Sequence, residues 1–276
     1  MKLRFLTLIF LVTFLFTPSK IFAKQISITC SLFPVYDFTR EIVKDNAKVK
    51  LILPKGVEPH EFEPSPMDIK ALNDSDIFIF TGKNMEGWAE KISGSLTFTK
   101  IIDASKNIEL INNDPHIWLD LNRAEIMVEN ILEGICEADN EHSEIYKLNA
   151  RNFLLKLSEL DEKFMGLNKN KSLVFAGEFA CNYFMKRYGF EYVSAYDGEN
   201  EPSVKRMAEI LKYIRENNVR YIFSDAGEIL PVTKSISEQT QTKILIFNSL
   251  HKVTDKKTFL QIMKDNYENI KIAVDD

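Results

Sequence analysis

Cysteine is scarce in this chain of 276 residues, which contains only Cys30, Cys136 and Cys181. An odd number of cysteines at such wide spacing does not suggest a disulfide framework, and at most one bridge could form. We therefore expect the fold to depend on an apolar core, with the three thiols buried as small hydrophobic side chains.

The chain also lacks an apolar run long enough to cross a membrane. The run at residues 5–16 has about twelve residues, whereas a membrane-spanning helix needs roughly 20. It follows Lys2 and Arg4 and precedes the small residue Ala23, which is the pattern of a secretory signal cut after Ala23. We expect residues 1–23 to direct secretion across the cytoplasmic membrane, which places the mature protein in the periplasm or at the cell surface.

Positive charge is not in excess. The sequence has 35 Lys and Arg against 40 Asp and Glu, and loss of the three positive charges in residues 1–23 changes the formal net charge from -5 to -8. An acidic surface argues against a nucleic-acid partner and does not repel cations. About 250 mature residues are enough to bury a sizeable core in one large or two medium domains.

Glycine-serine linkers, low-complexity tracts and sequence repeats are absent as well. Short β-rich runs alternate with helix-like stretches, which favours βαβ units and mainly parallel sheets in an α/β fold. Helix starts are marked at Ser65-Pro66, Asn122 and Ser203. The predicted strands are residues 26–32, 48–53, 76–81, 171–176, 190–196, 219–224 and 243–247.

One long segment breaks the alternation. Residues 142–165 contain no glycine or proline, and their large apolar side chains recur every three or four positions, which predicts one helix of about 25 residues, roughly 38 Å long. This helix is either one more amphipathic surface helix or the brace between two similar α/β lobes. The second interpretation divides the chain into a signal (1–23), an amino-terminal lobe (24–139), a linking helix (140–168) and a carboxy-terminal lobe (169–276).

The four histidines are the first candidates for chemistry. His60 lies in "VEPHEFEPSPMDI", which begins like the zinc-protease motif H-E-x-x-H but has Pro64 where the second histidine must be. His116 lies in "DPHIWLDL", His142 lies near the start of the long helix and is expected to be exposed, and His251 follows the last predicted strand. Local sequence alone does not separate a metal-ligating loop histidine from a solvated one.

The positions of the predicted strands favour His60 and two further residues as ligands. Ligands of α/β proteins bind outside the carboxyl ends of the strands. His60 follows the strand at 48–53 after a short loop, Glu178 comes two residues after the strand at 171–176, and Asn248 directly follows the last strand. These three side chains are therefore expected at the same kind of sheet edge.

Four segments together resemble a known family. They are "LILPKGVEPHEFEPSPMDIKALNDSDIFIFTG", "DPHIWLDL", "EFACNYFMKRYGF" and "NEPS", in that order. The chain is similar over its mature length to the cluster A-I solute-binding proteins of bacterial ABC importers for zinc and manganese. The resemblance implies two α/β lobes with mainly parallel sheets, joined by one long helix, with a single metal site between the lobes.

The resemblance also implies a ligand set. His60 and His116 match the family's first two ligands, and Glu178 matches the third, which is histidine in many zinc-type members and glutamate in manganese-type ones. Asn248 stands where the family has an aspartate, and an uncharged amide oxygen is a poorer donor to zinc. Asp225, or His251, is a candidate to compensate for this departure.

The implied function is transport without a chemical step. The chain is expected to be a monomer that captures one divalent transition metal ion, zinc or manganese, and delivers it to a membrane permease, and it is not expected to be an enzyme. Two other classes remain open. A secreted zinc metallohydrolase uses a similar ligand set with an open position. A surface adhesin whose metal pocket no longer binds an ion would account for Asn248 in place of the aspartate.

Overall fold

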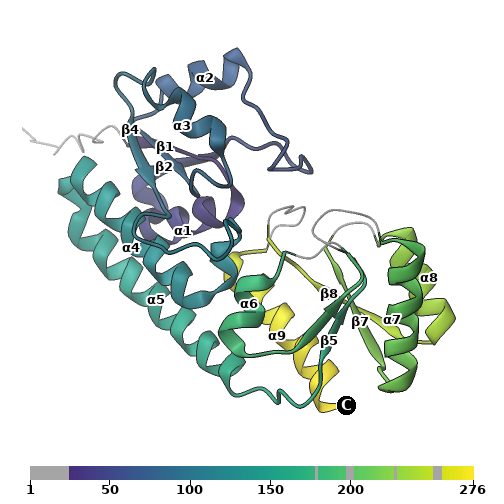
Figure 1. Cartoon of the computed structure of the whole chain (residues 1–276). Coiled ribbons are helices and arrows are strands. Elements are labelled where there is room, and N and C mark those ends of the chain that lie inside the picture. Colours follow the sequence, from purple (N-terminus) through teal and green to yellow (C-terminus); the bar gives the residue numbers. More distant parts are fainter. Residues whose placement is uncertain (1–24, 178–179, 197–201, 227–228, 251–256) are drawn as a thin grey trace, which may run out of the picture.

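The computed structural model of this chain describes residues 25–177, 180–196, 202–226, 229–250 and 257–276. Two four-stranded sheets lie near opposite ends of a long helix, α5 (Ser143–Met165), which runs along one flank of the molecule, as Figure 1 shows. Every strand pair in both sheets is parallel. Among the residues described, no helix combines the length and the apolarity that crossing a bilayer requires. The two α/β lobes expected from the sequence are confirmed.

The amino-terminal sheet has the strand order β2-β1-β3-β4. Its strand β3 is buried along its whole length, as expected for a parallel strand covered on both faces. The elements of this lobe are β1 (Ile26–Cys30), α1 (Phe33–Val43), η1 (Lys44–Asn46), β2 (Ala47–Leu51), α2 (Pro66–Asn73), β3 (Ile77–Phe80), α3 (Gly87–Ser93), β4 (Lys100–Asp103), η2 (Ile117–Leu119), α4 (Leu121–Ala138) and η3 (Asn140–His142).

The carboxy-terminal sheet repeats this arrangement as β6-β5-β7-β8. In each sheet the first strand of the lobe pairs with the second on one side and the third on the other, which creates a switch point where ligands of α/β proteins bind. The elements are β5 (Leu173–Phe175), α6 (Asn182–Tyr188), β6 (Tyr192–Ser194), α7 (Val204–Glu216), β7 (Tyr221–Asp225), α8 (Pro231–Thr240), β8 (Lys243–Phe247) and α9 (Phe259–Asp275).

A single apolar core joins the two lobes. It runs from the inner face of the first sheet through α1, α4 and α5 to α6, α9 and the second sheet, while two smaller clusters lie beneath α2 and α3 and beneath α7 and α8. Phe38 of α1 contacts Phe153 of α5 and Phe259 of α9, with ring centroids 5.7 Å and 4.7 Å apart. Separating the lobes would expose this shared core to water, so the junction is stiff.

Helix α5 confirms the predicted long helix. It packs against α1 and α4 of the first lobe and against α9 of the second. Its buried apolar residues are the six that the spacing picked out, Tyr146, Ala150, Phe153, Leu157, Leu160 and Phe164. The exact lobe boundaries and the cleaved signal stay predictions.

A buried carboxylate adds a polar contact at this junction. Asp37 of α1 is 3% exposed, and its Oδ2 accepts a hydrogen bond of 2.8 Å from the backbone N–H of Phe259, the first residue of α9. Burial raises the pKa of Asp37 from 3.8 to about 6, because the apolar surroundings disfavour the charged form. A carboxylate of one lobe thus caps the first turn of a helix of the other.

The structure corrects two expected element positions. Strand β4 was not predicted, because only Ile101 and Ile102 mark it as apolar. Helix α4 begins at Leu121 rather than after Asn122, because the carboxylate of Asp120 accepts hydrogen bonds from the first-turn N–H groups and is the N-cap. The starts at Ser65 and Ser203 are confirmed, and each hydroxyl accepts a hydrogen bond from the backbone three residues ahead.

Two expected exposures were wrong. Cys136 is only partly buried, whereas Cys30 and Cys181 are buried as predicted, and none of the three forms a disulfide. His142 was expected to be exposed but is only partly so, with 30% of its side chain accessible, and its Nδ1 pairs with the carboxylate of Asp139 at 2.9 Å.

Candidate metal centre

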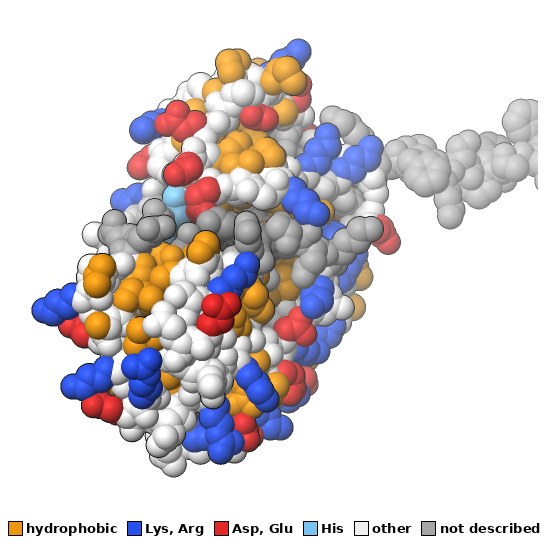
Figure 2. All heavy atoms as spheres, turned by 90° about the vertical axis from the view of Figure 1, so that its right-hand side faces the viewer, with side chains coloured by type: hydrophobic (Ala, Val, Ile, Leu, Met, Phe, Trp, Pro, Cys, Tyr) orange, Lys and Arg blue, Asp and Glu red, His pale blue; other side chains and the backbone are white. Residues whose placement is uncertain are grey.

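His60 lies in a loop that the prolines and apolar anchors hold in place. The loop after β2 folds through successive turns, with hydrogen bonds from Val57 N to Pro54 O and from Phe62 N to Pro59 O. Val57 and Phe62 pack against the core, so the loop is fixed at both of these points. His60 is exposed between them. Figure 2 shows histidine and acidic side chains side by side on the face where the lobes meet.

His116 lies directly before η2 and is held more tightly, with only 9% of the residue exposed. The Asp114 carboxylate accepts a hydrogen bond from His116 N at 2.9 Å and pairs with His116 Nδ1 at 2.7 Å. Burial alone would raise the pKa of Asp114, but the hydrogen bonds and charge of His116 outweigh it and lower the pKa below its usual value. The ring of Trp118 packs edge-on against the imidazole, with centroids 5.3 Å apart.

The structure brings the two predicted histidines together. Their Nε2 atoms are 3.4 Å apart, and the rings meet at an interplanar angle of 66°. Two nitrogen ligands of one tetrahedral zinc ion lie roughly 3.3–3.4 Å apart, given Zn–N bonds of about 2.0–2.1 Å. The pair is therefore spaced for coordination of a single ion, although His60 and His116 lie 56 residues apart in sequence.

Asn248 lies where it was predicted, in the loop after β8, with its side-chain oxygen turned onto its own loop. Its Oδ1 accepts a hydrogen bond of 2.8 Å from Leu250 N, and its backbone is held on both sides by Asn266. The loop is also tied to the first lobe, since Trp118 Nε1 donates to Ser249 O at 2.8 Å. This contact links the loop that carries Asn248 to the segment that carries His116.

Asp225 holds the same loop from the end of β7. Its carboxylate accepts hydrogen bonds from Ser249 N at 2.9 Å and from Ser249 Oγ at 2.6 Å, as well as from the N–H of Ala226. Both carboxylate oxygens of Asp225 thus hold backbone and hydroxyl groups in place, which favours a role in supporting the loop that carries Asn248. From the sequence, Asp225 was only a candidate substitute ligand. Its contact with Ser249 joins residues 24 positions apart, which no local sequence pattern indicates.

The remaining candidates, Glu178 and His251, fall outside the described residues. Within the part of the chain that the structure does describe, no group of three or more His, Cys, Asp or Glu side chains is arranged to hold a metal. Of the four predicted ligands, the structure describes His60 and His116, which it brings together, and Asn248, which lies in the opposite lobe. A set of two imidazoles, one carboxylate and one amide would suit a borderline divalent ion.

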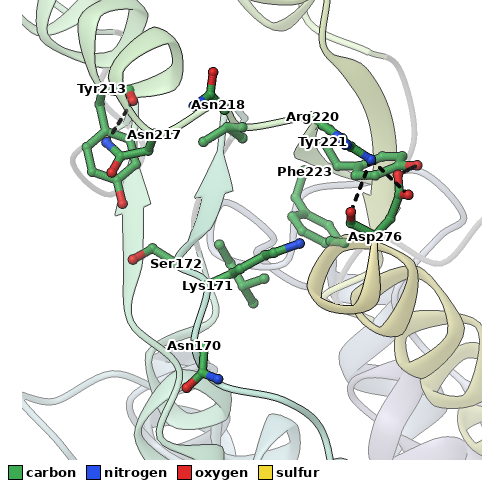
Figure 3. A pocket seen from close by; sticks show the side chains of 13 residues that line it. Asn170, Lys171, Ser172, Tyr213, Asn217, Asn218, Arg220, Tyr221, Phe223 and Asp276 are labelled. Atoms are coloured by element: carbon green, nitrogen blue, oxygen red, sulfur yellow. Dashed lines mark hydrogen bonds and ion pairs between the residues drawn. The ribbon is translucent and has the colours of Figure 1, made fainter.

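A pocket at the far end of the second lobe is separate from this site. It has a volume of about 370 Å³ and lies at the amino ends of β5 and β7, opposite the edge where Asp225 ends β7. Figure 3 shows Arg220 paired with Asp276 in its wall, at 3.0 Å. The pocket contains none of the candidate ligands.

Comparison with known proteins places the chain in a family. Residues 28–273 match the family ZnuA, described as zinc-uptake complex component A, periplasmic. The chain belongs to this family. The family description names a component of a zinc-uptake complex, which is a transport role.

Three similar proteins are informative. Zinc-binding protein AdcA of Streptococcus pyogenes serotype M3 is 28% identical over 321 aligned positions, which cover 100% of this chain but 62% of AdcA, so the chain spans about three-fifths of that protein. The high-affinity zinc uptake system protein ZnuA of Bacillus subtilis is 28% identical, with 90% of this chain and 87% of that protein aligned. The Zn(II)-bound ZnuA-like domain of Streptococcus pneumoniae AdcA superposes with a TM-score of 0.80 at 29% identity and covers 91% of this chain and 100% of that domain.

Proposed function

We propose that this ZnuA-family chain captures a single zinc ion outside the cytoplasmic membrane and passes it to the permease of an ABC importer. The observation that carries the proposal is the 3.4 Å separation of the Nε2 atoms of His60 and His116 at the lobe junction. Membership of the family and the Zn(II)-bound relative support zinc as the cargo. Manganese is the alternative cargo, because Glu178 and Asn248 would give the second lobe oxygen donors only.

The proposed site closes with ligands from both lobes. His60 and His116 would supply imidazole nitrogens from the first lobe, while Glu178 and Asn248 would supply oxygens from the second. Metal binding requires neutral imidazoles, so affinity should fall as the pH drops below the ordinary histidine pKa of about 6.5. The protein would act as a monomer with no nucleic-acid partner, and it would need no catalytic group.

Metal titration of the mature protein tests this function. Native mass spectrometry and calorimetry of residues 24–276 are expected to show one zinc ion per chain, with manganese bound more weakly, as the general order of divalent affinities predicts. Lowering the pH from about 7.5 to about 5.5 should weaken binding, since both imidazoles become protonated. Failure to bind either ion at micromolar concentration would contradict the proposal.

Replacing Asn248 with aspartate is expected to tighten zinc binding by about tenfold, a gain of roughly 1.4 kcal/mol. The single side-chain oxygen of Asn248 already accepts the N–H of Leu250, whereas a carboxylate offers a second oxygen and a negative charge. Calorimetric titration of both proteins measures the difference. Asn170→Asp adds the same charge at the far end of the lobe, beside the pocket in Figure 3, and should leave affinity unchanged. Equal affinity in Asn248→Asp and wild type would place residue 248 outside the coordination sphere.

A further inference from the structure

The carboxylate of Asp114 contacts both a proposed ligand of the first lobe, His116, and a side chain of the second lobe. Asp114 Oδ1 pairs with His116 Nδ1 at 2.7 Å, while Asp114 Oδ2 accepts a hydrogen bond of 3.0 Å from the side-chain amide of Asn182. Asn182 is the first residue of α6 and belongs to the other lobe. Its own amide oxygen accepts from the hydroxyl of Tyr192 at 3.2 Å, which turns the NH₂ group toward Asp114.

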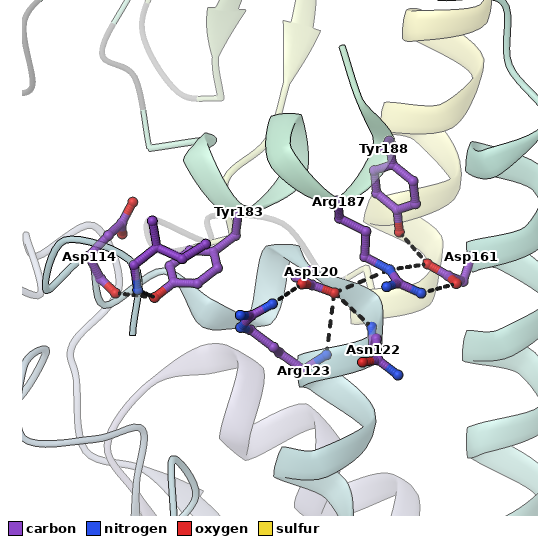
Figure 4. Close-up of polar contacts among 9 residues, drawn as sticks. Asp114, Asp120, Asn122, Arg123, Asp161, Tyr183, Arg187 and Tyr188 are labelled. Carbon is purple, nitrogen blue, oxygen red and sulfur yellow. Dashed lines mark hydrogen bonds and ion pairs between the residues drawn. The ribbon is translucent and has the colours of Figure 1, made fainter. Parts of the chain in front are cut away.

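The backbone of Asp114 is clamped by the next residue of the same helix. The hydroxyl of Tyr183 donates to Asp114 O at 2.8 Å and accepts from Ile111 N at 2.9 Å (Figure 4). Two consecutive residues of α6 thus hold both the side chain and the main chain of Asp114. The side chains of Asp114 and His116 are only 10% and 11% exposed, so water competes little for the contact between these two residues. Asn182 is exposed and supports this contact from the solvent side.

We propose that Asp114 is a positioning residue, through which the docking of α6 against the first lobe sets the tautomer and the direction of the His116 ring. An ionised carboxylate only accepts hydrogen bonds, so His116 Nδ1 must carry the proton and Nε2 keeps its lone pair. That lone pair is on the atom that faces His60 Nε2. Outer partners of this kind orient ligating histidines and raise their basicity.

The geometry couples the ligand to the lobe junction. Helix α6 begins four residues after Glu178 in sequence, so the same segment of the second lobe carries a proposed ligand and contacts Asp114. A displacement of α6 would break the contacts of Asn182 and Tyr183 with Asp114 and so loosen the hold of Asp114 on the ring of His116. Docking of the lobes therefore adds to the preorganisation that Asp114 and Trp118 give the His60–His116 pair within the first lobe. The metal-binding part of this inference rests on the proposed function, but the tautomer part does not.

Asp114→Ala is the decisive variant. Asp114 Oδ1 accepts from both His116 N and His116 Nδ1, and alanine removes this acceptor, so nothing at position 114 fixes the ring proton on Nδ1. The nitrogen-15 shifts of the His116 ring in the metal-free protein at pH 8 should show that the Nδ1–H tautomer no longer predominates. Zinc affinity should fall roughly 10–100-fold. Retention of the Nδ1–H tautomer, or of wild-type affinity where the wild type binds zinc, overturns the role of Asp114.

Two further variants test the coupling to α6 and the specificity for this site. Asn182→Ala should lose less affinity than Asp114→Ala, and the double variant should lose no more than Asp114→Ala alone, because Asn182 acts through Asp114. Additive losses would overturn the coupling to α6. Asp139→Ala removes the similar carboxylate–imidazole pair at His142, outside the site, and should leave zinc affinity unchanged. A tautomer change in Asp114→Ala without zinc binding by the wild type would refute the proposed function and leave the positioning role standing.

Discussion

Replacing His116 with alanine is expected to lower zinc affinity by at least about 100-fold. Structural zinc sites bind with about 10–16 kcal/mol, so one of four ligands accounts for roughly 3 kcal/mol, or about two decades in the dissociation constant. His116 is held on one edge by Asp114 and on one face by Trp118, so its imidazole is already fixed in the position from which it would bind the ion. Calorimetric titration with zinc measures the loss.

His142→Ala is the matched control for this experiment. His142 also pairs with a carboxylate, at 2.9 Å from Asp139, but it lies at the start of α5 and outside the proposed site. Zinc should raise the melting temperature of the wild type and of His142→Ala, because an ion that binds only the folded state stabilises it. It should not do so for His116→Ala. A His116→Ala protein with affinity within a factor of about three of wild type would place the site elsewhere.

Replacing Arg187 with methionine is expected to cost about 3 kcal/mol of unfolding free energy. Arg187 of α6 donates to both carboxylate oxygens of Asp161 on α5 and lies 3.2 Å from Asp120, the N-cap of α4 (Figure 4). The side chains of Asp120 and Asp161 are only 4% and 15% exposed. Loss of the guanidinium would leave the largely buried carboxylate of Asp161 without its counter-ion, while Asp120 keeps its ion pair with Arg123. An unpaired buried charge is costly even though the methionine side chain keeps much of the packing.

Thermal and denaturant unfolding measure this cost. For a protein of this size the melting temperature should fall by roughly 6–12 °C. Arg187→Lys should be intermediate, because an ammonium cannot donate to both oxygens of Asp161 in the forked geometry. Lys212→Met removes a cation from an exposed pair with Glu216 and should change stability by less than about 0.5 kcal/mol. A loss below about 1 kcal/mol in Arg187→Met would mean that the apolar core alone holds the junction.

Sequence patterns predicted the fold well where local chemistry decides it. The three-and-four spacing of α5 and the Ser65-Pro66 helix start are both properties of neighbouring residues, and both are confirmed. Strand β4 was missed because four residues with two isoleucines are too short to stand out. The cap of α4 was misplaced because Asp120 and Asn122 are both good capping residues, and only the observed hydrogen bonds choose between them.

The candidate site was predictable in part for the same reason. His60 and His116 were found from their positions and from the family resemblance, and the structure brings them together. Asp114 was not singled out, although an acidic residue two positions before His116 is a usable signal for a supporting carboxylate. Contacts across the junction, such as Asn182 with Asp114, join residues 68 positions apart and leave no local pattern. The roles of Glu178 and Asn248 stay predictions.

The buried carboxylate of Asp37 gives the lobe junction a response to acid that opposes that of the proposed site. Its pKa is raised from 3.8 to about 6, so between these values the folded protein binds more protons than the unfolded chain. Its contribution to stability is therefore greatest below about pH 4 and is lost as the pH rises through 6, a difference on the order of 2–3 kcal/mol. Mild acidification would thus relieve the cost of burying the charge of Asp37 at the α1–α9 junction, while it protonates the imidazoles of the proposed site and weakens metal binding. Asp37 would thus favour the docked lobes under the mildly acidic conditions that weaken the proposed metal site.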